Sequence, residues 1–294
     1  MRSAIRSMVA AAFAGVAACS GHAANVTATP GTVEALINAA RGGDRIVLAP
    51  GDYAPLSIKG KTWSPALTVE AAAGRMKHVE FNYVSGIVWH GGTFDGGDTI
   101  TNAFGAGHSD HVTVDGLRMS HYTRNNISLG ESSDARIVNN LITDSGSDGI
   151  DIALSRRVLV DHNECRDTNP TPGAHPDCIQ MWSRPTAPPV ADITITNNTV
   201  SGDTQGITGF NHIRDGVDDG GFDRIRVEDN KVAVKQWHGI TLTNCRSCVV
   251  RRNRVDTIPN GRIQAWIKFI ESDVEACGNV ISAYGEKEDK RCKE

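Results

Sequence analysis

The chain of 294 residues is 39% hydrophobic and 22% charged, a composition that is typical of a globular protein and excludes intrinsic disorder. Its formal net charge of -4 argues against nucleic acid as the main partner, because binding to a phosphate backbone requires a basic field.

Residues 1–24 have the layout of a secretory signal. Arg2 and Arg6 precede the apolar run MVAAAFAGVAA, which is too short to span a membrane. Two cleavage sites compete: the segment VAAC, ending at Cys19, resembles a bacterial lipobox, whereas Gly21-His22-Ala23 suits ordinary signal peptidase. We therefore predict an exported protein that is secreted, periplasmic or an outer-membrane lipoprotein, with Cys19 as its only contact with a membrane.

Six cysteines remain after Cys19, an even number that fits a compartment in which disulfides persist. Cys165 and Cys178 are candidates to close the loop between them. The spacing of Cys245 and Cys248 resembles half of a zinc site, but no second pair matches it, so this pair is expected to be a disulfide or buried thiols.

Residues 25–59 predict an N-terminal cap. The segment TVEALINAARGGDRIVLAPGDY has Val33, Leu36, Ile37 and Ala40 at helical spacing, and a strand pattern follows. Such a helix would cover the open end of a stack of strands.

Residues 60–282 are dominated by an internal repeat. Short segments of the V-x-V-x-x-N type recur: IVWHGGTF, VTVDGLRM, ARIVNNLI, VLVDHNEC, ITITNNTV, IRVEDNKV, CVVRRNRV and VEACGNVI. Their alternating apolar and polar residues predict strands, with a basic period of 23 residues and no helical period. The alignment also predicts a structural column of asparagines at the turns: Asn140, Asn163, Asn198, Asn230, Asn253 and Asn279.

A second strand column places isoleucines 127, 150, 179, 207, 240 and 263 in register. Two or more strands per coil predict an all-β, single-domain parallel β-helix of about eight coils, followed by a charged tail at residues 283–294. The cap, the repeats and the V-x-x-N turns of residues 28–282 resemble the right-handed parallel β-helix proteins of the pectate-lyase-like superfamily. Because members of that superfamily mostly cut or epimerise acidic polysaccharides, the resemblance implies a monomer that acts on such a polymer.

Two insertions interrupt the repeat, RDTNPTPGAHPD and GFNHIRDGVDDGGFD, and both adjoin the second strand column. Side chains alternate across a strand, so this register gives the column a polar outward face. One residue after each isoleucine come Ser128, Asp151, Gln180, Thr208, Thr241 and Gln264, and two residues before come Asn125, Asp148, Asp177, Gln205, His238 and Gly261. Charged and aromatic residues gather on or beside that face, and we predict a site there: His175, Trp182, His212, Arg214, Lys235, Trp237, His238 and Arg262.

Asp148 and Asp177 are expected one coil apart at this face, with Asp151 on the same coil as Asp148. Carboxylates that close together require a shared proton or a cation, and calcium is the cation expected for an exported protein that binds uronates. Alternatively, each aspartate bonds to the backbone of its own turn.

The chemistry expected first is β-elimination from a uronic-acid polymer, which needs a base at C5 and a group that neutralises the carboxylate. His238, Lys235 or His175 is expected to act as the base, and His238 is favoured because its intrinsic pKa suits neutral pH. Arg214, Arg262, Gln180 or calcium would neutralise the carboxylate. The other expected site residues are Asp177 and His212 for catalysis, and Trp182, Trp237 and Lys268 for substrate binding.

Other reactions remain open. SDGIDI, PDCIQM, WHGITL and GRIQAW resemble, in order, motifs of polygalacturonases, which are hydrolases, and would give functional roles to Asp148, Asp177, His238 and Arg262. However, the doubled aspartate of that family is Pro176-Asp177 here, and inverting hydrolysis needs two carboxyl groups. A C5-epimerase starts from the same proton abstraction as a lyase, and a β-helix that only binds polysaccharide is the non-catalytic alternative.

Overall fold

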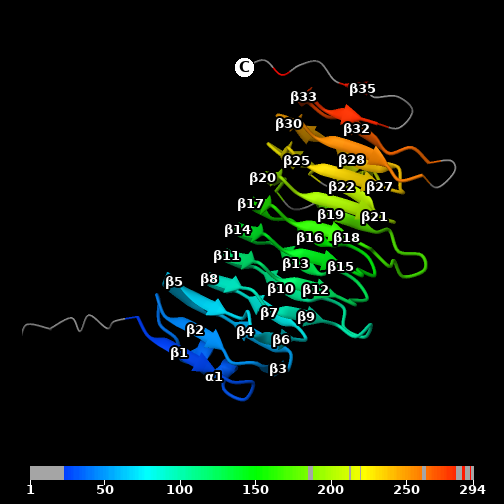
Figure 1. The fold of residues 1–294 in the computed structure, drawn as a ribbon. Coiled ribbons are helices and arrows are strands. Elements are labelled where there is room, and N and C mark those ends of the chain that lie inside the picture. Colours follow the sequence, from blue (N-terminus) through cyan, green and yellow to red (C-terminus); the bar gives the residue numbers. More distant parts are fainter. Residues whose placement is uncertain are drawn as a thin grey trace, which may run out of the picture.

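The structure is a computed structural model that describes residues 23–184, 188–211, 213–218, 220–259, 263–282, 287–288 and 292. Short strands of the described chain stack into three long parallel sheets that run side by side along a solenoid (Figure 1). We call one level of this stack a rung. The predicted all-β parallel solenoid is confirmed.

Sheet 1 contains the strands that precede the asparagine turns. Its main path is β1 (Asn25–Ala28), β2 (Arg45–Leu48), β5 (Thr62–Glu70), β8 (Ser85–His90), β11 (Asp110–Asp115), β14 (Ser133–Val138), β17 (Arg156–Asp161), β20 (Val190–Thr196), β26 (Arg226–Glu228), β30 (Cys248–Arg251) and β33 (Val274–Cys277). The short strands β25 (Phe222–Asp223) and β29 (Cys245–Arg246) pair beside this path.

Sheet 2 carries the predicted site. Within the described residues its order is β4 (Leu56–Lys59), β7 (Val79–Asn82), β10 (Phe104–Gly107), β13 (Ile127–Gly130), β16 (Ile150–Ala153), β19 (Asp177–Trp182), β22 (Gln205–Phe210), β28 (His238–Thr243) and β32 (Trp266–Ile270).

Sheet 3 follows the asparagine turns and closes each coil. It contains β3 (Gly51–Tyr53), β6 (Gly74–Met76), β9 (Thr93–Asp95), β12 (Arg118–Ser120), β15 (Leu141–Thr143), β18 (Glu164–Arg166), β21 (Thr199–Gly202), β27 (Lys231–Val234), β31 (Arg254–Thr257), β34 (Val280–Ile281) and β35 (Lys287–Glu288). Its strands are parallel except for the last, β35, which pairs antiparallel with β34. The second insertion forms a separate antiparallel pair, β23 (Ile213–Arg214) with β24 (Val217–Asp218).

The solenoid is longer than the eight coils expected from the repeat. The eight aligned segments begin in β8, β11, β14, β17, β20, β26, β30 and β33, and three further rungs of sheet 1, formed by β1, β2 and β5, precede them. These early rungs lack the V-x-x-N turn, so the repeat could not reveal them.

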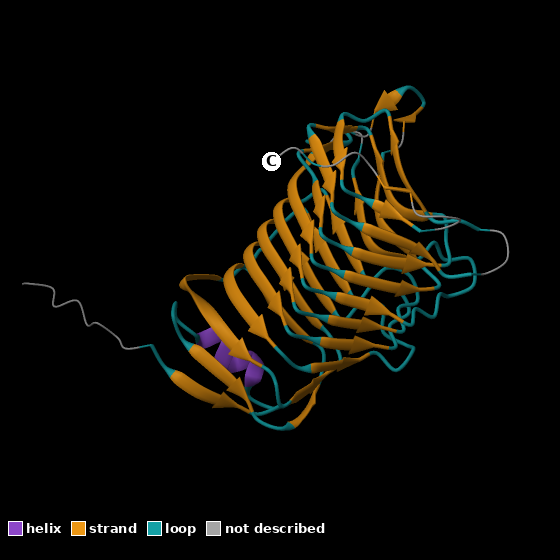
Figure 2. Ribbon diagram, turned by 45° about the horizontal axis from the view of Figure 1, so that its top comes forward, coloured by secondary structure: helices purple, strands orange, loops and turns teal. Residues whose placement is uncertain are grey.

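The N-terminal helix α1 (Val33–Ala39) lies at the first rungs, as Figure 2 shows. Val33 and Ile37 are buried, and Leu36 and Ala40 pack against the same core, so the amphipathic pattern is confirmed. No helix among the described residues is long and apolar enough to cross a membrane.

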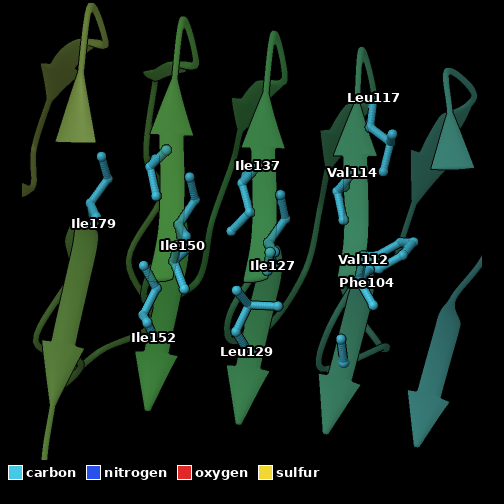
Figure 3. Packing of buried hydrophobic residues seen from close by; sticks show 14 of the residues in the cluster. Phe104, Val112, Val114, Leu117, Ile127, Leu129, Ile137, Ile150, Ile152 and Ile179 are labelled. Carbon is cyan, nitrogen blue, oxygen red and sulfur yellow. The ribbon is translucent and has the colours of Figure 1, made fainter. Parts of the chain in front are cut away.

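The interior is filled by aliphatic side chains stacked rung on rung (Figure 3). Ile127, Ile150, Ile179, Ile207 and Ile240 are partners in successive strands of sheet 2 and are all fully buried. The last position of this column was predicted wrongly, because Ile240 pairs with Ile267 rather than Ile263. The connection before β32 is therefore longer than the repeat implies, and Gln264 lies outside the column.

The asparagine column is confirmed as a structural ladder. The backbone N–H of Asn198 donates to Oδ1 of Asn230 at 2.9 Å, and the side-chain amide of Asn198 donates to the same oxygen at 3.0 Å. Asn140, Asn163 and Asn230 repeat this pattern toward the next rung. Each buried turn thus satisfies its backbone N–H through the neighbouring coil.

Two disulfides join Cys245 to Cys248 and Cys277 to Cys292. The expected disulfide between Cys165 and Cys178 is not formed: both are buried free thiols whose side chains point into the core, where they pack as small apolar groups. The loop that carries His175 is therefore held by hydrogen bonds rather than by a covalent link.

Candidate active site

Polar residues occupy the outward face of sheet 2 in a continuous register. Asp151 pairs with Gln180, Gln180 with Thr208, Thr208 with Thr241, and Thr241 with Lys268. The two insertions flank this face, since residues 167–176 lead into β19 and β23 follows β22. The column was predicted correctly as far as Thr241, and Lys268 takes the position that had been expected for Gln264.

Asp177 is the centre of a hydrogen-bond network and is fully buried. Its Oδ2 lies 2.9 Å from His175 Nδ1 and accepts a hydrogen bond of 2.9 Å from the Gln180 amide, and its Oδ1 accepts one of 2.8 Å from the Thr208 hydroxyl. A carboxylate only accepts, so His175 carries a proton on Nδ1. The hydrogen bond with Asp177 raises the pKa of His175 above its ordinary value. Asp177 therefore favours the protonated form of His175.

The far nitrogen of His175 meets Gln205. Gln205 Nε2 lies 2.7 Å from His175 Nε2, and Gln205 is only 7% exposed. Both ring nitrogens of His175 are therefore held by buried side chains, which fixes the ring but leaves no open lone pair. This makes His175 poorly suited to the role of base.

Asp148 is the carboxyl group with a free oxygen. Its Oδ1 accepts a hydrogen bond of 3.0 Å from the Asp177 backbone N–H, whereas Oδ2 has no hydrogen-bond partner among the described residues. Burial and then the neighbouring Asp177 carboxylate raise the pKa of Asp148 to about 7. Asp148 is thus able to hold or release a proton near neutral pH.

Asp151 differs from Asp148 because both of its oxygens are occupied. Oδ1 accepts a hydrogen bond of 2.7 Å from the Trp182 indole and Oδ2 one of 3.0 Å from the Asn125 amide. Burial raises the pKa of Asp151 to about 6 against the lowering effect of the Trp182 bond. The Arg184 guanidinium lies 5.2 Å from the Trp182 ring centroid, so this aromatic residue is anchored at both its edge and its face.

A line of rings continues from these aspartates toward the C-terminal rungs. The His175 ring centroid lies 5.8 Å from that of Phe210, which is 5.1 Å from His238, and His238 is 5.2 Å from Trp266. Trp237, which is 51% exposed, lies 5.7 Å from Trp266. Flat apolar faces beside polar groups are the surface that sugar rings stack on.

His238 and Lys268 add polar groups to this line. The Lys268 ammonium lies 5.2 Å from the Trp266 ring centroid. Burial is the main cause that lowers the pKa of His238, and the cations at His175 and Lys268 lower it further against the effect of Asp177. His238 is therefore a neutral imidazole at neutral pH.

Residues 102–268 match the family model described as the right handed beta helix region. The chain belongs to this family. Solved structures with the same fold include an exopolygalacturonase of family 28 from Yersinia enterocolitica, at 12% identity and a TM-score of 0.58 over 88% of this chain and 67% of that one. No curated protein sequence matches this chain.

Two further right-handed β-helix structures are similar. An endo-xylogalacturonan hydrolase from Aspergillus tubingensis has 13% identity and a TM-score of 0.55, over 92% of this chain and 100% of that one. An alginate lyase from Paenibacillus sp. str. FPU-7 has 15% identity and a TM-score of 0.52, over 87% of this chain and 94% of that one. At these identities, the likeness establishes the fold alone.

The three aspartates of this β-helix protein do not fit a calcium site. Five of their six carboxylate oxygens already accept hydrogen bonds from protein donors, whereas calcium takes six to eight oxygen ligands. Among the described residues no group of three or more His, Cys, Asp and Glu side chains is arranged to hold a metal ion. A proton bound to Asp148 is the other solution for close carboxylates, and it fits the raised pKa of Asp148.

Several residues predicted for the site either have another position or role, or fall outside the residues that the structure describes. His212 and Arg262 fall outside the described residues, and of Arg214 only the backbone, in β23, is described. Lys235 lies in the turn before β28, on the rung of His238. Gln180 donates its amide to Asp177, so it supports that carboxylate.

Sequence reasoning missed four residues of this site: Gln205, Thr208, Phe210 and Trp266. Thr208 and Gln205 stood in the predicted polar columns, which was the available signal. Phe210 and Trp266 carried none, because isolated aromatic residues are usual in a core.

Proposed function

We propose that the protein cleaves a uronic-acid-containing polysaccharide by β-elimination, with Asp148 as the group that accepts the C5 proton. The observation that carries this proposal is the unoccupied Oδ2 of Asp148, on a carboxyl group whose pKa is about 7. A base with that pKa is ionised at slightly alkaline pH and is a stronger base than an ordinary aspartate.

The state of the neighbouring carboxyl groups supports elimination over hydrolysis. Hydrolysis needs two carboxyl groups, of which one protonates the leaving oxygen and the other acts as base or nucleophile. Asp177 is fully buried, and both oxygens of Asp151 are occupied. One open carboxyl group is enough for elimination.

The charge on the outward face of sheet 2 supports an acidic substrate. When the C5 proton leaves, negative charge builds up on the adjacent carboxylate and must be balanced. Asp177 raises the pKa of His175, and protonated His175 would supply this balance without a metal ion once the Gln205 amide turns its oxygen toward Nε2. The names of the similar folds, an alginate lyase and an exopolygalacturonase, also favour a polysaccharide substrate.

The proposed step balances within the substrate. The Asp148 carboxylate takes the proton from C5, the electron pair of that bond forms the C4–C5 double bond, and the C4–oxygen bond breaks. The leaving oxygen takes a proton from water, and Asp148 then returns its proton to solvent. The products are an unsaturated sugar end and a new chain end.

Hydrolysis is the second candidate, because the raised pKa of Asp148 also suits a general acid that is protonated below pH 7. The two reactions make opposite demands on this carboxyl group. Elimination requires the ionised form, so its rate should rise as pH increases through about 7, whereas hydrolysis requires the protonated form and should slow over the same range.

The test incubates the mature protein with pectate, alginate and glucuronan over pH 5 to 9. Elimination gives a product that absorbs near 235 nm, while hydrolysis gives reducing ends without that absorbance. Asp148→Asn should lower the rate by about 10²- to 10⁴-fold, as expected for loss of a general base, while Asp151→Asn serves as the matched control. Full activity of Asp148→Asn on every cleaved polymer would refute the proposal.

Export is part of the proposal. The two disulfides of the described chain are stable in an oxidising compartment outside the cytoplasm, where polysaccharides are also found. Expression of the full chain in a bacterial host, with mass measurement of the mature N-terminus, separates cleavage before Cys19 with lipidation from cleavage after Ala23. A mature protein that retains residues 1–18 would refute export by this signal.

A further inference from the structure

A cluster of polar and aromatic side chains that the proposed chemistry does not use lies at β28 and β32, beginning three rungs from Asp148. It contains His238, Thr241, Trp266 and Lys268, with the exposed Trp237 beside them. Rungs are spaced by about 4.8 Å, so His238 lies roughly 14 Å from Asp148 along the outward face of sheet 2. At that distance the two residues contact different sugars of a bound chain.

The hydrogen bonds of Thr241 determine which nitrogen of His238 carries the proton. Thr241 is fully buried, and its Oγ1 lies 2.8 Å from His238 Nδ1. The Trp266 indole, which can only donate, directs its N–H at Thr241 Oγ1 at 3.2 Å and at His238 Nδ1 at 3.4 Å. No other partner of Oγ1 is found among the described residues.

Only one assignment satisfies this set. If His238 Nδ1 carried a proton, the imidazole and the indole would both donate to Thr241 Oγ1. The hydroxyl proton of the buried Thr241 would then have no acceptor among the described residues. If Nδ1 is bare, the indole donates to Oγ1 and the hydroxyl donates to Nδ1. Leaving a buried donor unpaired disfavours the first arrangement by roughly 5- to 150-fold. Neutral His238 therefore carries its proton on Nε2.

The opposite edge of the ring is open. Nε2 of His238 has no hydrogen-bond partner among the described residues, and the side chain is half-buried between Phe210 and Trp266. With its proton on Nε2, this imidazole presents a donor at the open edge, and its lone pair, on Nδ1, is occupied by the Thr241 hydroxyl. This arrangement argues against His238 as the base.

Lys268 gives the same region a positive charge. It stands next to Thr241 in the register of sheet 2, and its ammonium lies over the Trp266 ring. A fixed N–H donor, an ammonium group and the tilted pair of Trp237 and Trp266 match one ligand chemistry, a sugar ring that bears a carboxylate.

We propose that His238 Nε2–H and the Lys268 ammonium bind the carboxylate of a uronate residue that stacks on Trp237, about three rungs from the reacting sugar. Thr241 and Trp266 are positioning residues that hold His238 as a donor. The identification of the ligand as part of an acidic polysaccharide rests on the proposed function. The subsite itself does not require that the protein cleave the polymer.

Binding is tested apart from catalysis in the Asp148→Asn protein. Hexamers of galacturonate, mannuronate and glucuronate, and the same hexamers with their carboxyl groups reduced to alcohols, are titrated while tryptophan fluorescence is followed. At least one acidic hexamer should bind about tenfold or more tightly than its reduced form, and Lys268→Met should remove most of this difference. If the protein that retains Lys268 binds each acidic hexamer and its reduced form equally well, the subsite is overturned.

Two substitutions of His238 separate a donor from a base. The amide nitrogen of Gln reproduces Nε2–H and that of Asn reproduces Nδ1–H, so His238→Gln should bind and cleave within about threefold of the unsubstituted protein, while His238→Asn should lose about tenfold in affinity. Equal losses of about 10²-fold or more in cleavage for both variants would identify His238 as the base and overturn the donor assignment.

The proton position is read directly by ¹⁵N NMR of the imidazole above its pKa. Nε2 should give the signal of a protonated nitrogen and Nδ1 that of an acceptor; Thr241→Ser should keep this pattern and Thr241→Val should shift the Nδ1 signal. A protonated Nδ1 overturns the inference. If acidic hexamers bind and the NMR pattern holds but no polymer is cleaved, the proposed function fails and the subsite stands.

Discussion

Replacement of Asp148 by Asn should make the protein more stable at alkaline pH. The folded pKa of Asp148 is about 7, against 3.8 for an ordinary aspartate. The folded protein therefore keeps a proton that the unfolded chain releases, and the free energy of unfolding falls as pH rises from about 4 to about 7. The shift of about three pH units corresponds to up to about 4 kcal/mol at pH 8.

The substitution suits this test because Asn keeps the contacts of the site. Its Oδ1 still accepts the Asp177 backbone N–H, and its amide nitrogen takes the position of the unoccupied Oδ2. We expect Asp148→Asn to raise the Tm by roughly 5–10 °C at pH 8 and to leave it almost unchanged at pH 4. Activity should be lost in the same variant, since a strained group at an active site commonly trades stability for function.

The measurement is thermal unfolding by circular dichroism for the substituted and unsubstituted proteins at pH 4, 6 and 8, with a further point near pH 2 for the Asp134 control. Asp134 provides a control of opposite sign, because its hydrogen bond with Arg157 lowers its pKa to about 2. Asp134→Asn should therefore lose stability at neutral pH, with the difference from the unsubstituted protein disappearing as pH falls toward about 2. Parallel Tm curves for Asp148→Asn and the unsubstituted protein between pH 4 and 8 would refute the raised pKa.

Three further predictions follow from the ladder and the site. Asn230→Ala removes the buried hydrogen bonds of this side chain to Ile195, Glu228 and Asn253. It should lower the free energy of unfolding, measured by urea titration, by about 2–4 kcal/mol. A loss below about 0.5 kcal/mol would contradict the ladder's role. Asp177→Asn, which turns an amide N–H toward His175, should lower the pKa of His175 by NMR and slow cleavage at least about tenfold, and an unchanged pKa would rule out Asp177 as its cause. Excess chelator should change neither the Tm nor the rate of cleavage, because protein donors occupy the carboxylate oxygens of the aspartates. If chelator lowers the rate and added calcium restores it, a metal ion displaces these donors in the active protein.

Local pattern was sufficient to predict the solenoid. Each coil repeats the same alternation of apolar and polar residues, and such strands bury their inward faces only when they stack on their neighbours. The asparagine column followed for the same reason, since a turn that recurs at a constant period meets its own copy on the next rung. The isoleucine column failed at Ile263, where an irregular connection breaks the period and Ile267 pairs instead.

The residues of the site were found from the sequence more readily than their roles. The polar columns placed Asp148, Asp177 and His238 on one face, because side-chain alternation and rung spacing are properties of the strand itself. Their chemistry depends on hydrogen-bond donors that come from other coils and from the insertion. Donors to Asp151 and Asp177 leave Asp148 as the open carboxyl group, and Trp266, 28 residues beyond His238, contributes to its tautomer.

Sequence therefore determined the architecture of this protein and the face on which its polar groups gather, because both depend on a period that repeats along the chain. Only the tertiary structure decided which carboxyl group is free, which histidine has a raised pKa and where the proton of His238 resides. These properties are set by burial and by single contacts between residues far apart in sequence, and no repeating pattern records them.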